Sequence, residues 1–147
     1  MYKVMVVDDN ATVLAIIKAV LGKEYEISTM ESGVQALGYL KESVPPDVIL
    51  LDLIMPGMGG LEVLKLLQED PKLRNIAVII LSGMKRADYQ VQAIQAGADD
   101  FIQKPVNGDI LKFKIKHSLE VREIQRKNQF YREQIRNMCD QLNGLLN

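Results

Sequence analysis

The first 119 residues of the chain alternate between short apolar runs and amphipathic stretches. The apolar runs are rich in Val, Ile and Leu and are bounded by polar or turn-forming residues, which is typical of strands. Between them, apolar residues recur at intervals of three and four positions, which indicates helices. The predicted strands cover residues 3–7, 26–30, 47–51, 77–81 and 100–103.

Helix start and stop signals support the same division of the chain. Ser32 is suited to begin the helix after the second strand, and Pro71 and Gly97 are suited to end helices. Asn107 or Asp109 is expected to cap the final helix. Five successive strand–helix units predict an α/β fold, a doubly wound five-stranded parallel sheet with helices on both faces. In such sheets the ligand site lies beyond the carboxyl ends of the strands.

Composition narrows the class of protein and the kind of metal site. With 147 residues, 48% of them hydrophobic and 25% charged, the chain matches one globular domain. Cys139 and His117 are the single cysteine and histidine, which excludes a zinc site built from several such ligands. A divalent ion would need oxygen ligands, as Mg²⁺, Mn²⁺ and Ca²⁺ do. The sequence contains no signal peptide or membrane-length apolar run, so we expect a cytoplasmic protein with no membrane partner.

Charge is nearly balanced overall but is unevenly distributed. The formal net charge is −1, with ten basic and fifteen acidic residues up to residue 111 and eight basic and four acidic residues after it. A basic tail can bind nucleic acid, but aromatic residues make up only 5% of the chain and Trp is absent. Bases would therefore find few surfaces on which to stack. We expect the tail to be a solvated helix with no nucleic-acid partner.

Polar residues gather where four of the five predicted strands end. Asp8 and Asp9 follow the first strand, and Asp52 follows the third. Ser82 follows the fourth strand, and Lys104 follows the fifth. Each residue alone would be an ordinary cap or loop residue, but a parallel sheet brings these strand ends to one edge. The sequence therefore predicts three carboxylates, a hydroxyl and an ammonium group in one small volume.

Such a cluster is suited to phosphoryl transfer. Neighbouring carboxylates resist ionisation unless a cation is present, and Mg²⁺ accepts carboxylate oxygens together with water and phosphate oxygens. A metal ion, an ammonium group and a hydroxyl would stabilise the charge of a phosphoryl group during transfer. An aspartate can itself be the nucleophile and become an aspartyl phosphate. Asp52 is the best candidate, because it stands alone on the central strand with the other groups on both sides.

Several motifs resemble the receiver (CheY-like) domain of two-component response regulators. The motifs are Asp8-Asp9, Asp52-Leu53-Ile54-Met55-Pro56-Gly57-Met58-Gly59-Gly60, Ser82-Gly83 and Phe101-Ile102-Gln103-Lys104-Pro105. The likeness covers residues 2–119 in order and spacing and implies a flavodoxin-like sheet of strand order 2-1-3-4-5. It also implies a phosphoacceptor switch rather than an enzyme, with only self-phosphorylation and autodephosphorylation chemistry. A histidine kinase or phosphotransfer protein would be its partner.

The resemblance implies a role for each acidic residue. Asp52 would accept the phosphoryl group. Asp9, Asp52 and the backbone carbonyl of Ile54 would ligate Mg²⁺, and Asp8 would bind it directly or through water. Ile54 and Met84 occupy positions where receivers tune the hydrolysis of their aspartyl phosphate. Both side chains are apolar and cannot orient a water molecule, so we expect a slowly decaying phosphoryl state.

The same resemblance assigns the remaining residues of the cluster. Lys104 would pair with the phosphoryl group, and its peptide bond to Pro105 is expected to be cis. Ser82 would move to donate a hydrogen bond to a phosphoryl oxygen. Phe101 would turn inward as the switch aromatic. Some receivers have tyrosine at this position, so packing alone can hold the phenylalanine ring inward.

Three other interpretations remain open. A Mg²⁺-dependent phosphohydrolase would also use Asp52 as a nucleophile, but such families usually place a second acid where this chain has Ile54. A flavin- or nucleotide-binding domain would usually need a glycine-rich first turn, and Asp8 and Asp9 would repel a phosphate without a metal. A scaffold with a vestigial site would not be expected to retain all five polar residues of the cluster.

From Val121 onward the apolar spacing becomes a strict alternation of three and four, which fits a heptad repeat. Heptad position a is occupied by Val121, Asn128, Ile135 and Leu142. Position d is occupied by Ile124, Tyr131, Met138 and Leu145. β-branched residues at a with one Asn favour a parallel two-stranded coiled coil, although a helix packed back on the domain would show a similar pattern. We therefore expect a receiver domain over residues 1–119 and a coiled-coil helix over residues 120–147. This helix would form a parallel homodimer and lead to an effector domain outside this chain.

Overall fold

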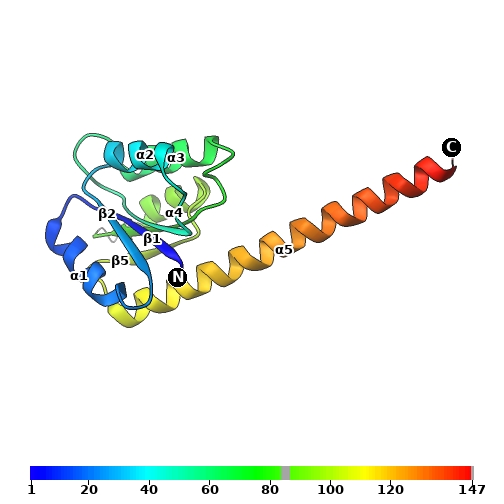
Figure 1. Cartoon of the computed structure of the whole chain (residues 1–147). Helices are drawn as coiled ribbons and strands as arrows, with labels where there is room; N and C mark the ends of the chain where they lie inside the picture. Colours follow the sequence, from blue (N-terminus) through cyan, green and yellow to red (C-terminus); the bar gives the residue numbers. More distant parts are fainter. Residues whose placement is uncertain (84–86, 147) are drawn as a thin grey trace.

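The computed structural model describes residues 1–83 and 87–146. Its strands are β1 (Lys3–Val7), β2 (Glu26–Met30), β3 (Val48–Asp52), β4 (Ala77–Ser82) and β5 (Asp100–Gln103). Its helices are α1 (Ala11–Leu21), α2 (Gly33–Glu42), α3 (Gly60–Glu69), α4 (Ala87–Gln95) and α5 (Gly108–Leu146). The strands form one parallel sheet in the order β2-β1-β3-β4-β5, which confirms the doubly wound fold (Figure 1).

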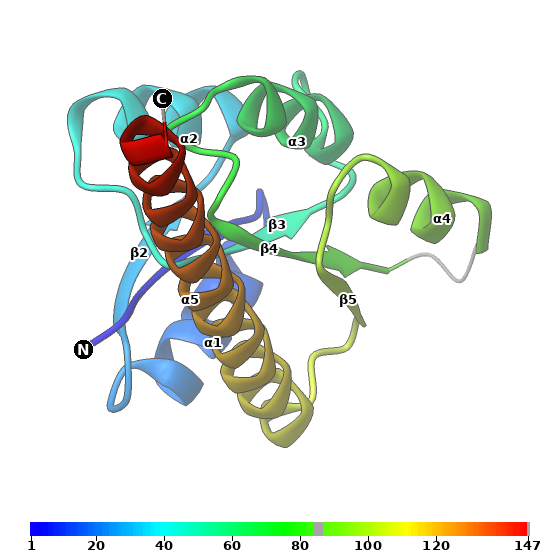
Figure 2. The same cartoon turned by 90° about the vertical axis from the view of Figure 1, so that its right-hand side faces the viewer.

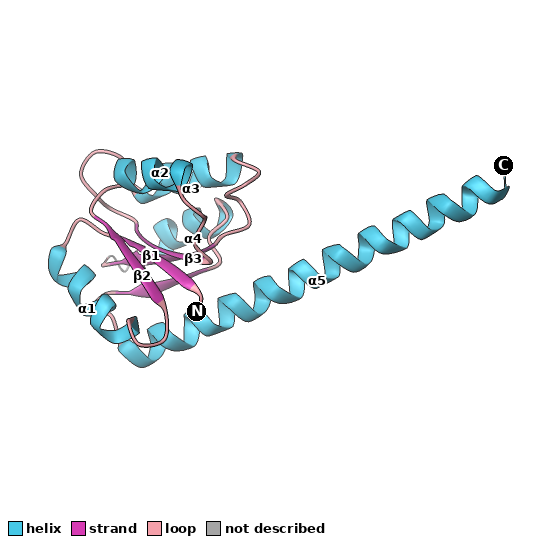
Figure 3. Cartoon of the chain, in the orientation of Figure 1, coloured by secondary structure: helices cyan, strands magenta, loops and turns pink. Residues whose placement is uncertain are grey.

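The sheet separates two apolar cores, because successive side chains of a strand point to opposite faces. On one face, residues such as Met5 and Ile49 pack with α2, α3 and α4. On the other face, residues such as Val6 and Leu50 pack with α1 and α5. Figure 3 shows these helices on the two sides of the sheet. Both faces of the central strands are covered, which explains why their sequences are almost entirely apolar.

Side-chain caps begin the helices where the sequence predicted them. Ser32 accepts a hydrogen bond from the backbone N–H of Gln35 at the start of α2. At the start of α5, the side-chain oxygen of Asn107 accepts hydrogen bonds from the N–H groups of Asp109 and Ile110. Asn107 is therefore the cap of the final helix, and Asp109 lies in its first turn. These bonds satisfy donors that have no partner within the helix.

The last helix, α5, packs on the sheet at its start and then projects away from the domain (Figure 1). Leu111, Ile115 and Ser118 are buried. Arg122 is the last anchor, and its Nη2 donates to the two carboxylate oxygens of Asp99 at 2.9 and 2.7 Å. The helix continues without a break through residue 120. Among the described residues, no helix combines the length and apolarity needed to cross a bilayer.

Gly60 lets the start of α3 lie directly against the end of β3. Its backbone N–H donates to the carbonyl oxygen of Leu53 at 2.9 Å. A Cβ added at Gly60 would collide with the backbone oxygen of Asp52 and would lie 2.8 Å from the Cα of Leu53. Both neighbours are backbone atoms, so they cannot move without displacing the end of β3. The close approach therefore fixes the backbone that carries Asp52.

We expect Gly60→Ala to lower the free energy of unfolding by roughly 2–3 kcal/mol, because an added methyl group overpacks rigid backbone. Gly38→Ala is the matched control. Gly38 is an exposed glycine inside α2, and a Cβ there would meet nothing within 4 Å. This substitution should raise stability by about 0.5–1 kcal/mol, because alanine has the higher helix propensity. Urea denaturation measures both changes, and equal changes for the two variants would contradict the constraint.

Candidate phosphoryl and metal site

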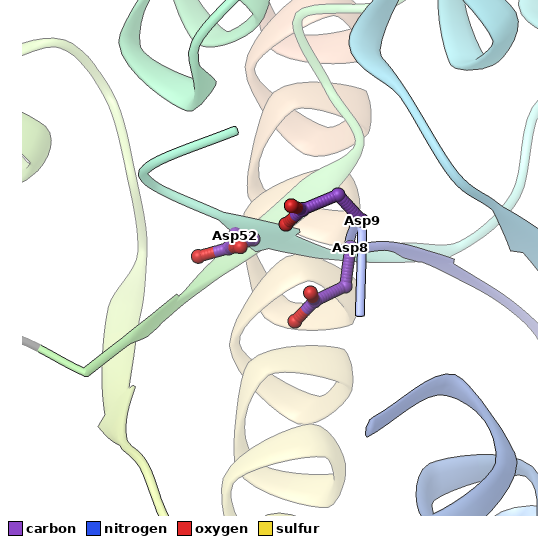
Figure 4. Close-up of side chains that lie close together, drawn as sticks. All are labelled: Asp8, Asp9 and Asp52. Atoms are coloured by element: carbon purple, nitrogen blue, oxygen red, sulfur yellow. The ribbon is translucent and has the colours of Figure 1, made fainter. Parts of the chain in front are cut away.

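The sequence-predicted site residues come together at the carboxyl edge of the sheet. Asp8 and Asp9 lie on the segment that leaves β1, and Asp52 is the last residue of β3 (Figure 4). Ser82 is the last residue of β4, and Lys104 follows β5. Asp52 and Ser82 therefore belong to their strands, although the sequence placed both residues just beyond the strand ends. Strand pairing extends one residue further than predicted because polar side chains at a strand end do not interrupt the backbone ladder.

Three carboxylates are close enough to share one metal ion. One oxygen each of Asp8, Asp9 and Asp52 lies within 4.8 Å of the others. Asp8 is fully buried, only 5% of Asp52 is exposed, and Asp9 is exposed to solvent. Ligand oxygens on opposite sides of an octahedral Mg²⁺ lie about 4.2 Å apart, so a small inward movement would bring all three to bonding distance. The donor set is hard oxygen, which fits Mg²⁺.

Lys104 supplies the positive charge of the cluster. Its Nζ lies 2.7 Å from Oδ2 of Asp8 and 3.5 Å from Oδ2 of Asp52. Burial alone would lower the pKa of Lys104, but the contacts with Asp8 and Asp52 outweigh it and raise this pKa. The ammonium group therefore stays charged at neutral pH. With all three acids ionised, the four side chains carry a formal charge of −2, which a divalent cation would neutralise.

Burial raises the pKa of Asp52 above its ordinary value of 3.8, and repulsion from Asp8 raises it further, to about 6. Lys104 and the backbone N–H of Ile54, which lies 3.4 Å from Oδ1 of Asp52, lower this pKa in part. Asp52 is therefore ionised at neutral pH but at an energetic cost. A bound cation would remove that cost, because it would offset both the burial and the repulsion.

Residues around the cluster occupy the positions that the motifs predicted. Asp52 pairs with Leu81 in the sheet, so the buried Ser82 lies one position further along the neighbouring strand. The side chain of Ile54 is 53% exposed two residues after Asp52. Met84, the other residue expected to tune phosphoryl lifetime, lies outside the described residues.

The peptide bond between Lys104 and Pro105 is cis, as the resemblance implied. Phe101 is half-buried and packs against the core on the α2, α3 and α4 face. The Nζ of Lys114 lies 5.3 Å from the centre of the Phe101 ring and donates to its carbonyl oxygen at 2.8 Å. The same Nζ lies 2.9 Å from the carboxylate of Asp100. Lys114 thus ties α5 to Phe101, a contact that sequence spacing did not reveal because it joins distant segments.

Residues 4–116 match the family model described as the response regulator receiver domain. Response regulator PleD of Caulobacter vibrioides is 37% identical over 112 residues, which cover 76% of this chain and 24% of that protein. A probable cyclic di-GMP phosphodiesterase of Vibrio cholerae is 32% identical over 117 residues, which cover 80% of this chain and 26% of that protein. The chain spans about a quarter of the length of these two relatives.

Solved receiver structures have the same fold. A CheY-like receiver domain protein from Methanospirillum hungatei matches with a TM-score of 0.78 and 27% identity, covering 85% of this chain and 98% of that one. The BeF3-activated DrrB receiver domain matches with a TM-score of 0.72 and 30% identity, covering 82% and 98% of the two chains. These shares of the chain are too large to come from α5 alone, which has 39 residues.

We expect Asp52→Asn to stabilise the fold in metal-free buffer, because it removes a carboxylate that is costly to ionise. The pKa of Asp52 is about 6 in the folded protein and 3.8 ordinarily, so the folded chain binds more protons between these values. The contribution of Asp52 to wild-type stability should therefore fall as pH rises from about 4 to about 6 and level off above that range. The variant should exceed it by up to about 3 kcal/mol above pH 7 and by little near pH 4.

Urea denaturation at several pH values, with a chelator present, measures this difference. Glu69→Gln neutralises an exposed acid on α3 and should change stability by less than about 0.5 kcal/mol at every pH. Added Mg²⁺ should stabilise the wild type more than Asp52→Asn. A pH-independent difference between the wild type and Asp52→Asn would show that ionising Asp52 does not cost the folded protein stability.

Proposed function

Because the chain belongs to the response regulator receiver domain family, we propose that it is a phosphoacceptor switch in which Asp52 takes a phosphoryl group from a histidine kinase or phosphotransfer protein. The observation that carries this proposal is the acidic cluster around Asp52. Asp8 and Asp52 are buried, Asp9 is exposed, and the ammonium group of Lys104 lies 3.5 Å from Asp52. The chemistry would be limited to gain and loss of this phosphoryl group, without a separate substrate.

In the transfer step, a carboxylate oxygen of Asp52 would attack phosphorus as the bond between phosphorus and the imidazole nitrogen of the donor breaks. The donor nitrogen keeps the electron pair of that bond. The pKa of Asp52, about 6, leaves its carboxylate ionised at neutral pH and available for attack. Lys104 would stabilise the charge of the phosphoryl oxygens, and the hydroxyl of Ser82 would donate a hydrogen bond to one of them. Bound Mg²⁺ would supply further charge neutralisation, held by Asp8, Asp9, Asp52 and the backbone carbonyl of Ile54.

The phosphoryl state would reach α5 through the elements beside the site. The backbone N–H of Lys104 donates to the carbonyl oxygen of Ser82 at 2.8 Å, so a movement of Ser82 would act directly on the end of β5. Phe101 lies on β5 and touches Lys114 of α5. We therefore expect phosphorylation to shift Ser82 and Phe101 and to repack the face formed by α4, β5 and α5.

The projecting part of α5 would carry the state onward by pairing with a second copy in a parallel coiled coil. Its heptad core residues from Ile124 onward are exposed, so they are free to face another helix. The relatives named above are a response regulator and a probable cyclic di-GMP phosphodiesterase, and this chain matches about a quarter of each. The effector would be a domain or protein outside this chain. The protein would be cytoplasmic.

Acetyl phosphate with Mg²⁺ should add the mass of one phosphoryl group to the wild-type chain. Asp52→Asn should abolish this addition, because the nucleophilic oxygen is lost. Asp70→Asn, which changes an acid at the far end of α3, is the matched control and should label like the wild type. Intact-mass spectrometry makes the measurement, and labelling that persists in Asp52→Asn would reject the site assignment.

The phosphoryl group should be lost slowly, with a half-life of minutes or longer. The exposed Ile54 side chain beside Asp52 is apolar and cannot orient the attacking water. Ile54→Asn should shorten the half-life by roughly tenfold or more, because its amide can position a water molecule. Loss of labelled phosphate after removal of the donor gives both rates. A wild-type half-life of seconds would contradict this expectation.

A further inference from the structure

The α5 helix has an exposed apolar stripe on the side that faces away from the sheet. Its buried residues Leu111, Ile115 and Ser118 mark the side that faces the sheet. Among the exposed apolar residues of α5, Phe130 lies about 110° from the direction that the others share. At about 100° per residue, the others fall within about 50° of that direction, roughly opposite the buried side. They are Ile110, Phe113, Ile124, Tyr131, Ile135, Met138, Leu142 and Leu145. Figure 2 shows the projecting end of α5 coming toward the viewer, and in Figure 1 α5 runs along the lower edge of the domain with no other described element below it.

This outer stripe begins on the receiver itself, before the heptads start. Ile110 and Phe113 lie in the first two turns of α5 and are 49% and 69% exposed. His117, one turn later, stacks on Phe113 with ring centres 6.1 Å apart and is also exposed. The stripe therefore runs from the globular domain into the projecting helix without a change of face.

A second copy of this chain fits the stripe better than an unrelated helix does. Asn128 is the one polar residue among the heptad core positions, and a parallel, in-register dimer places it opposite an identical Asn that can donate to it and accept from it. The stripe lies opposite the side that packs on the sheet, so two receivers would sit on the outer sides of the paired helices. The domains would therefore not block the pairing.

Charges beside the seam weaken this pairing in the projecting part. In a parallel dimer, a residue at heptad position g lies near position e of the next heptad on the other helix. Lys127 occupies g and Arg132 occupies the following e, so each side of the dimer brings two cations together near Asn128. The neighbouring pair, Glu120 with Gln125, offers no opposite charge to compensate. The seam thus combines a polar core layer with like-charge repulsion.

We propose that two copies pair in parallel along the whole outer stripe of α5, and that Ile110 and Phe113 supply contact area that the projecting helix needs to pair. This rests on the pairing function proposed above and locates it partly on the receiver. Phe113 is next to Lys114, whose ammonium group holds the backbone and ring of Phe101. A shift of Phe101 would thus act on the turn of α5 that carries the receiver part of the interface.

Sedimentation equilibrium of the full chain tests the receiver part of the interface. Phe113→Ala should raise the dimer dissociation constant by about tenfold, because a large exposed ring would lose its contact with the second copy. Val34→Ala is the matched control, since Val34 is 66% exposed on α2, on the other face of the sheet, and should leave the constant unchanged. If Tyr131→Ala weakens the dimer while Phe113→Ala does not, the interface is confined to the tail and the proposal is wrong.

Charge reversal tests whether the two helices pair along these heptad positions and whether they are parallel. Lys127→Glu should tighten the dimer by several-fold, because it would face Arg132 of the second copy, and Arg132→Glu should do the same. The double variant restores like charges and should return toward the wild-type constant. A spin label on Cys139, the exposed single cysteine, should give one short distance in a parallel dimer. A lack of tightening, a long distance or a monomer at every concentration would overturn the pairing, whereas phosphoryl labelling of Asp52 is measured independently.

Discussion

The electrostatic balance around one ammonium group determines what this domain can do. Lys104 lies 2.7 Å from Asp8 and 3.5 Å from Asp52, so one positive charge serves two buried acids. Lys104 does not fully offset the burial and mutual repulsion of these acids, because the pKa of Asp52 remains raised to about 6. The cluster would therefore respond to a further cation, or to the phosphoryl group that we propose Asp52 accepts. A fully neutralised cluster would have no such response.

The rest of the fold holds that balance in place. The charged groups come from three different segments. Asp8 and Asp9 follow β1, Asp52 ends β3, and Lys104 follows the edge strand β5. Two apolar cores cover these strands, and the close approach at Gly60 prevents the end of β3 from shifting. The energy that gathers like charges is therefore supplied by apolar burial on both faces of the sheet, which is a large and non-directional contribution.

Much of the fold and of the site composition could be predicted from the sequence. Apolar periodicity located every strand to within one residue, and a parallel sheet necessarily brings Asp8, Asp52 and Lys104 to one edge. What could not be predicted depends on side-chain directions between distant segments. Two contacts join α5 to segments 13 and 23 residues earlier, namely Lys114 with Phe101 and Arg122 with Asp99. No local sequence pattern could predict them. Heptad spacing likewise located apolar positions on the last helix but could not show that they lie roughly opposite the side of α5 that packs on the sheet.

The anchor between Arg122 and Asp99 also has a mechanical meaning. It is the last polar attachment of α5 to the domain among the described residues, and the helix runs on for about 36 Å from there to Leu146. The anchor can therefore act as a fulcrum and the helix as a stiff lever arm. A tilt of about 10° around it would carry the far end by about 6 Å, roughly one helical turn. A displacement too small to disturb the acidic cluster would become a sideways movement of several ångströms at the far end of α5.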